Sequence, residues 1–201
     1  MNLKWMLPRT RFGEYLVRFN SLNERGFKTW VFHPGMLFHS TDRWWGDGGR
    51  RDHPHEGLDL CLFRDRHGDD HTLDETIKIP LMFDGDVVHI VNDYIGKSVF
   101  FIHDVCDDQG NRLYSIYGHT EPYDGIAKGK TFHEGDVIAT IKDTRKQKVD
   151  MMPHLHLSVA WISTSLPCDK LNWQTIRDPG IATLLNPLAF IDCTYTVAKE
   201  M

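Results

Sequence analysis

Residues 153–161 read Pro153-His154-Leu155-His156-Leu157-Ser158-Val159-Ala160-Trp161, and this stretch predicts a β-strand with two chemically different faces. Side chains alternate along a strand, so the two histidines and the serine share one face, while Leu155, Leu157 and Val159 share the core side. Two imidazoles roughly 7 Å apart can serve one metal site, as two ligands or as a ligand beside a proton-transfer group. Taken alone, an H-x-H pair also fits two ordinary strand histidines.

A second motif lies upstream, in His55-Glu56-Gly57-Leu58-Asp59. Its glycine lets the backbone bend between the histidine and the aspartate at the entry to a predicted strand. An imidazole nitrogen and a carboxylate oxygen both suit zinc, with bonds of about 2.0–2.2 Å. With His156 these residues would form a three-ligand site with its fourth position open, which is typical of catalytic zinc. The alternative is an aspartate that caps a turn near a surface histidine.

A third motif, Tyr117-Gly118-His119, ends a well-patterned strand on which Leu113, Ser115, Tyr117 and His119 alternate onto one face. A single histidine at such a position is usually just a polar residue at a strand end. Its interest comes from its place between the other two motifs.

These three motifs, in this order, closely resemble those of the lysostaphin-type (LytM-like) zinc endopeptidases, the peptidoglycan hydrolases of bacterial cell walls. Those domains carry H-x-G-x-D, then Y-x-H, then H-L-H. The resemblance covers roughly residues 50–161 and includes the turn at Asp84-Gly85 and the strand entry Glu134–Ala139, where Ala139 replaces the family's usual glycine. It implies a mainly β fold, a compact antiparallel β-sheet of barrel-like form.

The resemblance also implies roles for five residues of this chain. His55, Asp59 and His156 would hold one Zn²⁺ ion, and His119 and His154 would be the catalytic histidines, with the division of work between them left open. The implied activity is hydrolysis of peptide cross-links in peptidoglycan by a zinc-activated water. A Gly–Gly bridge and a D-alanyl linkage both fit as the bond cleaved.

Two other functions compete with this interpretation. One is a catalytically inactive LytM-like module that binds peptidoglycan or a partner and regulates another hydrolase. Such modules typically lack ligands, whereas all five positions are filled here. The other is a zinc carboxypeptidase that trims cell-wall peptides, which would contain the same metal and differ only in its products.

Composition excludes several classes of protein. The 201 residues are 41% hydrophobic and 25% charged, which is ordinary for a soluble globular chain. A net charge of −5 argues against nucleic-acid binding, and no stretch approaches the ~18–20 apolar residues of a membrane span. The four cysteines, at 61, 106, 168 and 193, form no C-x-x-C pair.

The cellular location is inferred from the implied substrate. The resemblance implies an extracytoplasmic protein, in the periplasm or at the cell surface. The apolar run Trp5-Met6-Leu7 before Pro8 is too short for a signal peptide. No feature of the sequence specifies an oligomeric state.

Hydrophobic periodicity gives the organisation of the chain. We predict an amphipathic helix over residues 10–24, ended by Gly26, within an N-terminal segment (1–28) that packs on the peptidase domain (29–201). A short helix is expected in the C-terminal stretch IATLLNPLAFI. Two charged segments, Arg64–Glu75 and Lys142–Asp150, are predicted to be exposed loops that border the substrate groove, and Trp44-Trp45 either lines that groove or anchors its loop. The predicted strands are Thr29–His33, Gly57–Phe63, Thr76–Met82, Val87–Asn92, Ser98–His103, Arg112–His119, Asp136–Lys142 and His154–Trp161.

Overall fold

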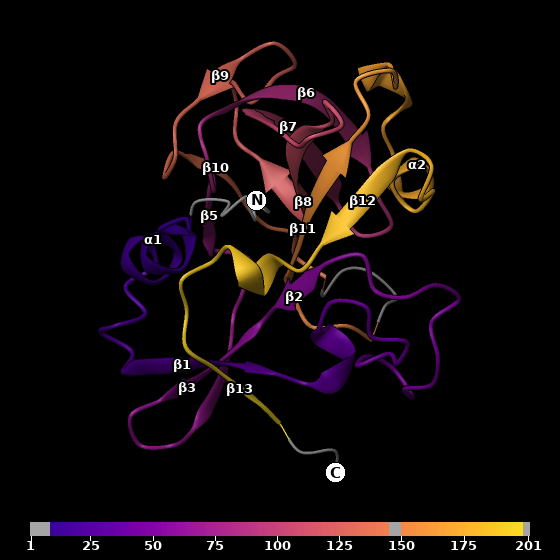
Figure 1. Ribbon diagram of the computed structural model, residues 1–201. Coiled ribbons are helices and arrows are strands. Elements are labelled where there is room, and N and C mark those ends of the chain that lie inside the picture. The colour runs from indigo at the N-terminus through magenta and orange to yellow at the C-terminus, as the bar shows by residue number, and fades with distance from the viewer. Residues whose placement is uncertain (1–8, 145–149, 199–201) are drawn as a thin grey trace, which may run out of the picture.

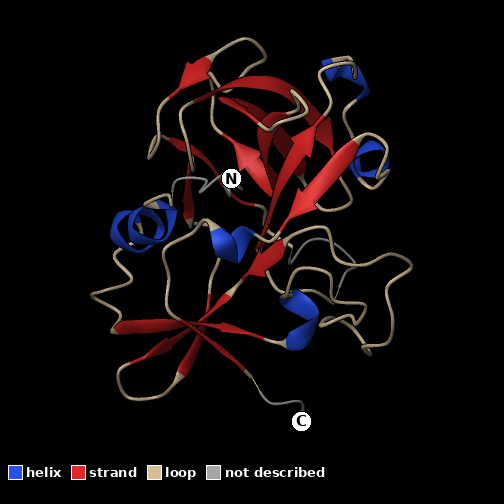
Figure 2. Ribbon diagram, in the orientation of Figure 1, coloured by secondary structure: helices blue, strands red, loops and turns tan. Residues whose placement is uncertain are grey.

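The computed structural model describes residues 9–144 and 150–198, and within these residues the protein is mainly β (Figure 2). The described strands form two open sheets, a larger one of nine strands and a smaller one of four (Figure 1). All strand pairs are antiparallel except one in the smaller sheet. The expectation of a mainly β, antiparallel fold is confirmed.

The larger sheet has the order β12-β11-β8-β7-β6-β9, with shorter strands at its margins. Strand β10 pairs with β5 and β8, and β2 pairs with β11. The strands are β2 (Leu58–Leu60), β5 (Lys78–Pro80), β6 (Gly85–Asn92), β7 (Lys97–Cys106), β8 (Arg112–Pro122), β9 (Thr131–Phe132), β10 (Val137–Ile141), β11 (Leu155–Ile162) and β12 (Ala182–Leu185).

Strand β11 forms where the alternation predicted it and is central to the larger sheet. Leu155, Leu157 and Val159 lie in the main hydrophobic core, as expected for one face. The histidine face is buried as well, because the ring of Trp173 covers His156 at a centroid distance of 4.8 Å. Polar side chains on this face therefore lie under protein and need partners there.

The smaller sheet has the order β13-β1-β3-β4, formed by β1 (Phe27–Phe32), β3 (Leu62–Asp65), β4 (Asp70–Thr72) and β13 (Tyr195–Val197). β13 runs parallel to β1, with Trp30 opposite Tyr195. The single strand predicted over Gly57–Phe63 is split at Cys61, because the chain leaves the larger sheet after β2 and enters the smaller one at β3. This crossing places the end of β2 where the two sheets meet (Figure 1).

The N-terminal helix is shorter than predicted. Helix α1 spans Phe12–Phe19, and turns continue to Gly26, which has the left-handed φ of 80° that favours glycine. The helix lies beside β5 (Figure 1). There the Asn20 side-chain amide accepts the Lys78 backbone N–H at 2.7 Å and donates to the Lys78 carbonyl at 2.9 Å. The division of the chain at residue 28 stays a prediction.

The predicted short C-terminal helix is confirmed, but it lies upstream of the expected stretch. This helix, α2, spans Trp173–Ile176, and a second turn, η2, precedes it at Cys168–Lys170. Residues 182–185 form β12 because they pair with the exposed edge of β11, and only Pro187–Ala189 makes a helical turn, η3. Tertiary pairing here outweighs the local apolar pattern.

Segment Arg64–Glu75 is not the loop that its charges suggested. Its residues form the β3–β4 hairpin, in which Asp65 accepts backbone N–H groups of the turn and contacts His71 at 2.9 Å, while Arg64 pairs with Asp70.

All four cysteines are free thiols. Among the described residues, no helix has the length and apolar character required to cross a membrane.

Candidate metal centre

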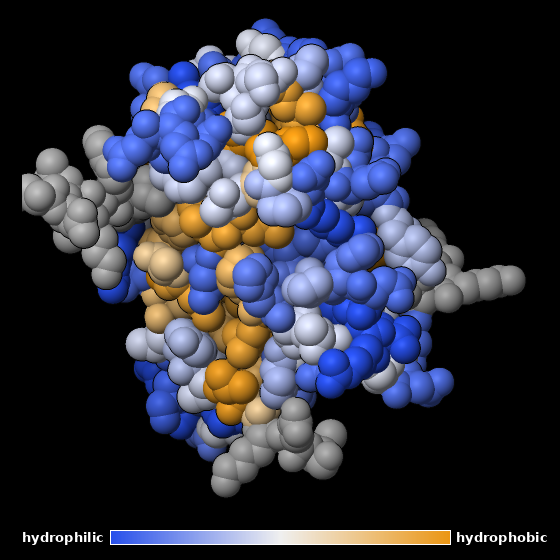
Figure 3. All heavy atoms as spheres, turned by 45° about the vertical axis from the view of Figure 1, so that its right-hand side comes forward, coloured by the Kyte–Doolittle hydropathy of each residue, from blue (hydrophilic) through white to orange (hydrophobic). Residues whose placement is uncertain are grey.

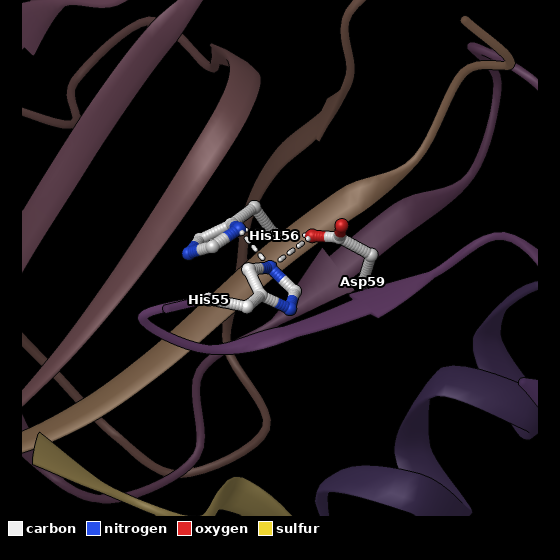
Figure 4. Close-up of side chains that lie close together, drawn as sticks. All are labelled: His55, Asp59 and His156. Carbon is white, nitrogen blue, oxygen red and sulfur yellow. Dashed lines mark hydrogen bonds and ion pairs between the residues drawn. The ribbon is translucent and has the colours of Figure 1, made fainter. Parts of the chain in front are cut away.

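Three predicted ligands converge between β2 and β11 (Figure 4). In the antiparallel pairing of these strands, Asp59 lies opposite His156, and His55 comes from the loop just before β2. His55 Nε2 lies 3.1 Å from both Asp59 Oδ1 and His156 Nδ1, and His156 Nδ1 lies 2.8 Å from Asp59 Oδ1. All three side chains are buried. Within the described residues, this is the one group of three or more His, Cys, Asp and Glu side chains spaced to hold a metal ion.

The arrangement of these donors fits zinc. Bonds of about 2.1 Å in a tetrahedron give a donor–donor edge of roughly 3.4 Å, slightly longer than the observed separations of 2.8 and 3.1 Å. A small outward movement of each side chain would therefore admit an ion. Two imidazoles and one carboxylate are also a donor set that catalytic zinc sites use.

Each of the two histidines in the cluster is held by its second nitrogen. The Nδ1–H of His55 donates to the Leu37 carbonyl at 3.0 Å, which leaves its Nε2 lone pair facing the cluster. His156 Nε2 lies 3.0 Å from Ser158 Oγ, which accepts the remaining ring proton when Nδ1 is the ligand. Such second partners set the tautomer and ring orientation of metal-binding histidines. The serine predicted on the histidine face of β11 thus has a positioning role.

Gly57 makes the close approach of the loop to β11 possible. A Cβ atom at this position would lie 2.2 Å from the Leu157 carbonyl oxygen and 2.9 Å from His156 Nε2. Any larger residue would push the loop away from the strand that carries His156. The glycine between His55 and Asp59 is therefore required by space rather than by an unusual backbone angle.

The second carboxylate oxygen of Asp59 is occupied. Trp44 Nε1–H donates to Oδ2 at 2.7 Å, and the Arg51 guanidinium lies 3.4 Å from the same atom. Burial by itself would raise the pKa of Asp59, but the close contacts of its carboxylate with His55, His154 and His156 hold the pKa well below its usual value. The carboxylate is thus ionised and directs only Oδ1 toward the histidines.

His154 lies next to the cluster without joining it. Its Nδ1–H donates to the Met152 carbonyl at 2.9 Å, and its Nε2 is 3.9 Å from Asp59 Oδ1. The Trp44 ring packs edge-on against it, with centroids 5.0 Å apart. Burial lowers the pKa of His154 to about 3. The ring is therefore neutral, with a bare Nε2 beside the cluster.

His119 reaches the same space by breaking the alternation of β8. Gly118 pairs with His156 and Tyr117 with Leu157, so regular alternation would place His119 on the core face, as the sequence predicted. Instead it has a left-handed φ of 61°, and its ring lies 4.8 Å from that of His154. The predicted shared face with Leu113, Ser115 and Tyr117 is therefore wrong for His119.

Asp93, in the β6–β7 turn, holds His119 in this unusual conformation. Its carboxylate accepts the His119 backbone N–H at 2.9 Å and lies 3.2 Å from Nδ1. Ser98 and the backbone N–H groups of Ile95 and Gly96 also donate to it, at 2.6 to 2.9 Å. Burial opposes ionisation, but the contact with His119 and these donors lower the pKa of Asp93 below its usual value. The His119 Nδ1–H therefore faces a carboxylate, and Nε2 is left as the proton acceptor.

Sequence reasoning missed Asp93, Arg51 and the contact of Trp44 with Asp59. The stretch Asp93-Tyr94-Ile95-Gly96 carries a turn signal that would have placed it between strands. It contains no indication that this turn meets the end of β8. Both alternatives for Trp44-Trp45 hold, because Trp44 anchors the loop to Asp59 and Trp45 lines a cavity beside the histidines.

Two cavities open beside the cluster. One, of about 210 Å³, is lined by His119, His156, Tyr94 and Trp173; the other, of about 170 Å³, is lined by His154, Met151 and Trp45. In the described structure, neither cavity is lined by a residue of Arg64–Glu75. The prediction that this segment borders the site is therefore not supported by these two cavities. For Lys142–Asp150, residues 145–149 lie outside the described residues; the Lys142 N–H donates to the His119 carbonyl at 2.9 Å.

No protein-family model matches this chain, and no curated protein matches it. Several solved structures are similar to it, among them CbpA and lysostaphin. CbpA from L. salivarius REN has a TM-score of 0.46 and 17% identity over 80% of this chain and 86% of its own. The solution structure of lysostaphin has a TM-score of 0.40 and 17% identity over 66% of this chain and 51% of its own, so this chain spans about half of lysostaphin. Both similarities concern the fold alone.

Proposed function

We propose that this protein is a zinc-dependent metalloendopeptidase that hydrolyses peptide cross-links of bacterial peptidoglycan. The observation that carries the proposal is the convergence of His55, Asp59 and His156 with donor atoms 2.8 to 3.1 Å apart. Two further histidines lie against this cluster and are not needed as ligands. The order and spacing of the three motifs supports the choice of substrate.

The proposed roles follow from the geometry of the side chains. A zinc ion held by the three ligands would supply a Lewis acid that polarises a peptide carbonyl and acidifies a water. His154 and His119 each present an Nε2 beside the cluster, and either nitrogen would accept a proton from the attacking water and return it to the leaving amine. Asp93 keeps the His119 ring in position, and the Met152 carbonyl does the same for His154.

A partly exposed histidine beside the buried cluster supports a catalytic site rather than a purely structural metal site. The three ligands are almost fully covered, while His119 is 19% exposed and lines the neighbouring cavity. A substrate in that cavity would thus meet His119, a proton acceptor, and His156, one of the three proposed ligands, on the same wall. Because peptidoglycan lies outside the cytoplasmic membrane, we propose an extracytoplasmic location.

Digestion of purified peptidoglycan, followed by mass analysis of the products, tests this function. The zinc-loaded protein should cut the cross-linking peptides and release fragments that are no longer cross-linked, a chelator should stop the release, and added zinc should restore it. Loss of single terminal residues would instead identify a carboxypeptidase. Equal release by thoroughly demetallated protein, or binding with no release, would contradict the proposal.

A further inference from the structure

A positively charged hollow adjoins the candidate metal centre. It has a volume of about 410 Å³, and its charged walls are Arg43, Arg50, Arg51 and Arg177 with Asp52 and Glu56. Four cationic groups thus face two carboxylates in a chain whose net charge is −5. Figure 3, which brings the right-hand side of Figure 1 forward, shows hydrophilic residues gathered over the lower right of this face.

The hollow is continuous with the site. Arg51, Glu56 and Arg177 line both this hollow and the cavity that contains His119 and His156. Glu56 is also the residue directly after His55. A peptide seated against the catalytic histidines would therefore extend into the charged hollow.

Two of the cations are already committed to the fold. Arg51 donates to the carbonyls of Gly35 and Asp42, lies beside Asp59, and stacks on Trp45 at 4.3 Å. Arg177 forms an ion pair with Glu56, whose side chain is buried. These contacts hold the walls of the hollow in place and leave Arg51 little capacity to bind anything else.

Arg43 and Arg50 are different, because their guanidinium groups are exposed and have no hydrogen bond or ion pair within the described part of the chain. Their backbone is nevertheless fixed. The Arg43 N–H donates to the Gly49 carbonyl at 2.8 Å, the Arg51 N–H donates to Thr41 at 2.8 Å, and Asp42 pairs with Arg50 across the loop. Two free guanidinium groups are thus presented from a loop that is ordered in advance, which lowers the entropy cost of binding.

We propose that Arg43 and Arg50 bind a carboxylate of the substrate peptide and so select acidic stem peptides for cleavage. A guanidinium offers paired N–H donors that match a carboxylate, and such charge-assisted bonds are stronger than neutral ones. This inference rests on the proposed peptidase function. The carboxylate can be the C-terminal group of the peptide or that of a side chain.

A pair of matched substrates tests the proposal: peptidoglycan-derived peptides with free carboxylates, and the same peptides with those groups converted to amides. We expect kcat/KM of the zinc-loaded protein to be about tenfold higher for the acid form, mainly through KM. In the double variant Arg43→Gln/Arg50→Gln this preference should fall to near unity. Arg66→Gln, which removes the same charge from the β3–β4 turn, should keep the full preference. Amidation of the C-terminus alone, or of side chains alone, identifies the group recognised.

Equal cleavage of both forms by the unaltered protein, or an unchanged preference in the double variant, would overturn the carboxylate site while leaving the peptidase function intact. If neither form is cleaved, the peptidase proposal itself fails. In that case titration calorimetry with the same two peptides decides the question. Weaker binding after amidation supports the carboxylate site, and equal or absent binding overturns it.

Discussion

The two histidines of β11 provide the most direct test of the site, because they share one strand face and differ in their distance from the ligand cluster. His156 Nδ1 lies 2.8 Å from Asp59 Oδ1 and 3.1 Å from His55 Nε2. His154 Nε2 lies 3.9 Å from the same Asp59 oxygen, and its other nitrogen is bound to a backbone carbonyl. We expect His156→Ala to lose the metal and His154→Ala to keep it.

The size of each effect follows from the role assigned. Four ligands of a structural zinc site contribute about 10–16 kcal/mol in total, so loss of one ligand should cost roughly 3 kcal/mol, or about a hundredfold in affinity. Removal of a general base should lower the rate by about 10²–10⁴ and leave the metal in place. His119→Ala should resemble His154→Ala.

Zinc affinity can be measured by competition with a chromophoric chelator, zinc content by elemental analysis after dialysis, and kcat on a peptidoglycan-derived peptide. His133→Ala is the matched control, because this histidine is 78% exposed and pairs with Asp84 away from the cluster. Its zinc affinity and kcat should equal those of the unaltered protein. If His154→Ala loses zinc and His156→Ala retains it, the two roles must be exchanged.

Three further changes probe the surroundings of the site. Asp93→Asn should lower kcat by roughly 10²-fold with zinc content unchanged, because His119 loses the carboxylate that orients it; an unchanged kcat would show that Asp93 only shapes its turn. Gly57→Ala should destabilise the fold by about 1–3 kcal/mol in urea unfolding and weaken zinc binding, since its Cβ would meet the Leu157 carbonyl at 2.2 Å. Gly110→Ala, where no atom lies within 4 Å but φ is 79°, controls for destabilisation alone: it should lower stability through backbone strain and leave zinc affinity unchanged. Burial lowers the pKa of His103 to about 4 from 6.5, so the unfolded chain takes up a proton first as the pH falls. Stability from this group is therefore complete above pH 6.5 and falls toward pH 4, by about 2 kcal/mol at pH 5. His103→Gln should show a correspondingly smaller loss of unfolding free energy between pH 7 and pH 5, and an equal loss in both proteins would refute this account.

Local patterns were enough to predict most of the central strands, and the three motifs together, through their resemblance to a known family, pointed to the three candidate ligands. The alternation around His154 and His156 predicts a strand with a polar face, because a strand's side-chain period of two is a property of the backbone itself. From sequence, the glycine of H-E-G-L-D is explained by a backbone bend, whereas the structure requires it for the close approach of its loop to β11. A candidate metal site of this kind can be predicted from sequence motifs because its donors are few and chemically distinctive.

The features that sequence could not predict depend on which segments lie side by side. β13 pairs with β1, which lies near the other end of the sequence, and β12 forms because it pairs with the edge of β11. The residues of these two strands do not predict a strand by themselves. His119 left its expected face because Asp93, from a different turn, holds its backbone in a left-handed conformation. The charged hollow likewise exists only after the loop of Arg43 and Arg50 meets Arg177. Sequence determined the chemistry of the groups; tertiary structure decided which of them meet, because pairing between distant strands depends on the partner as much as on the strand itself.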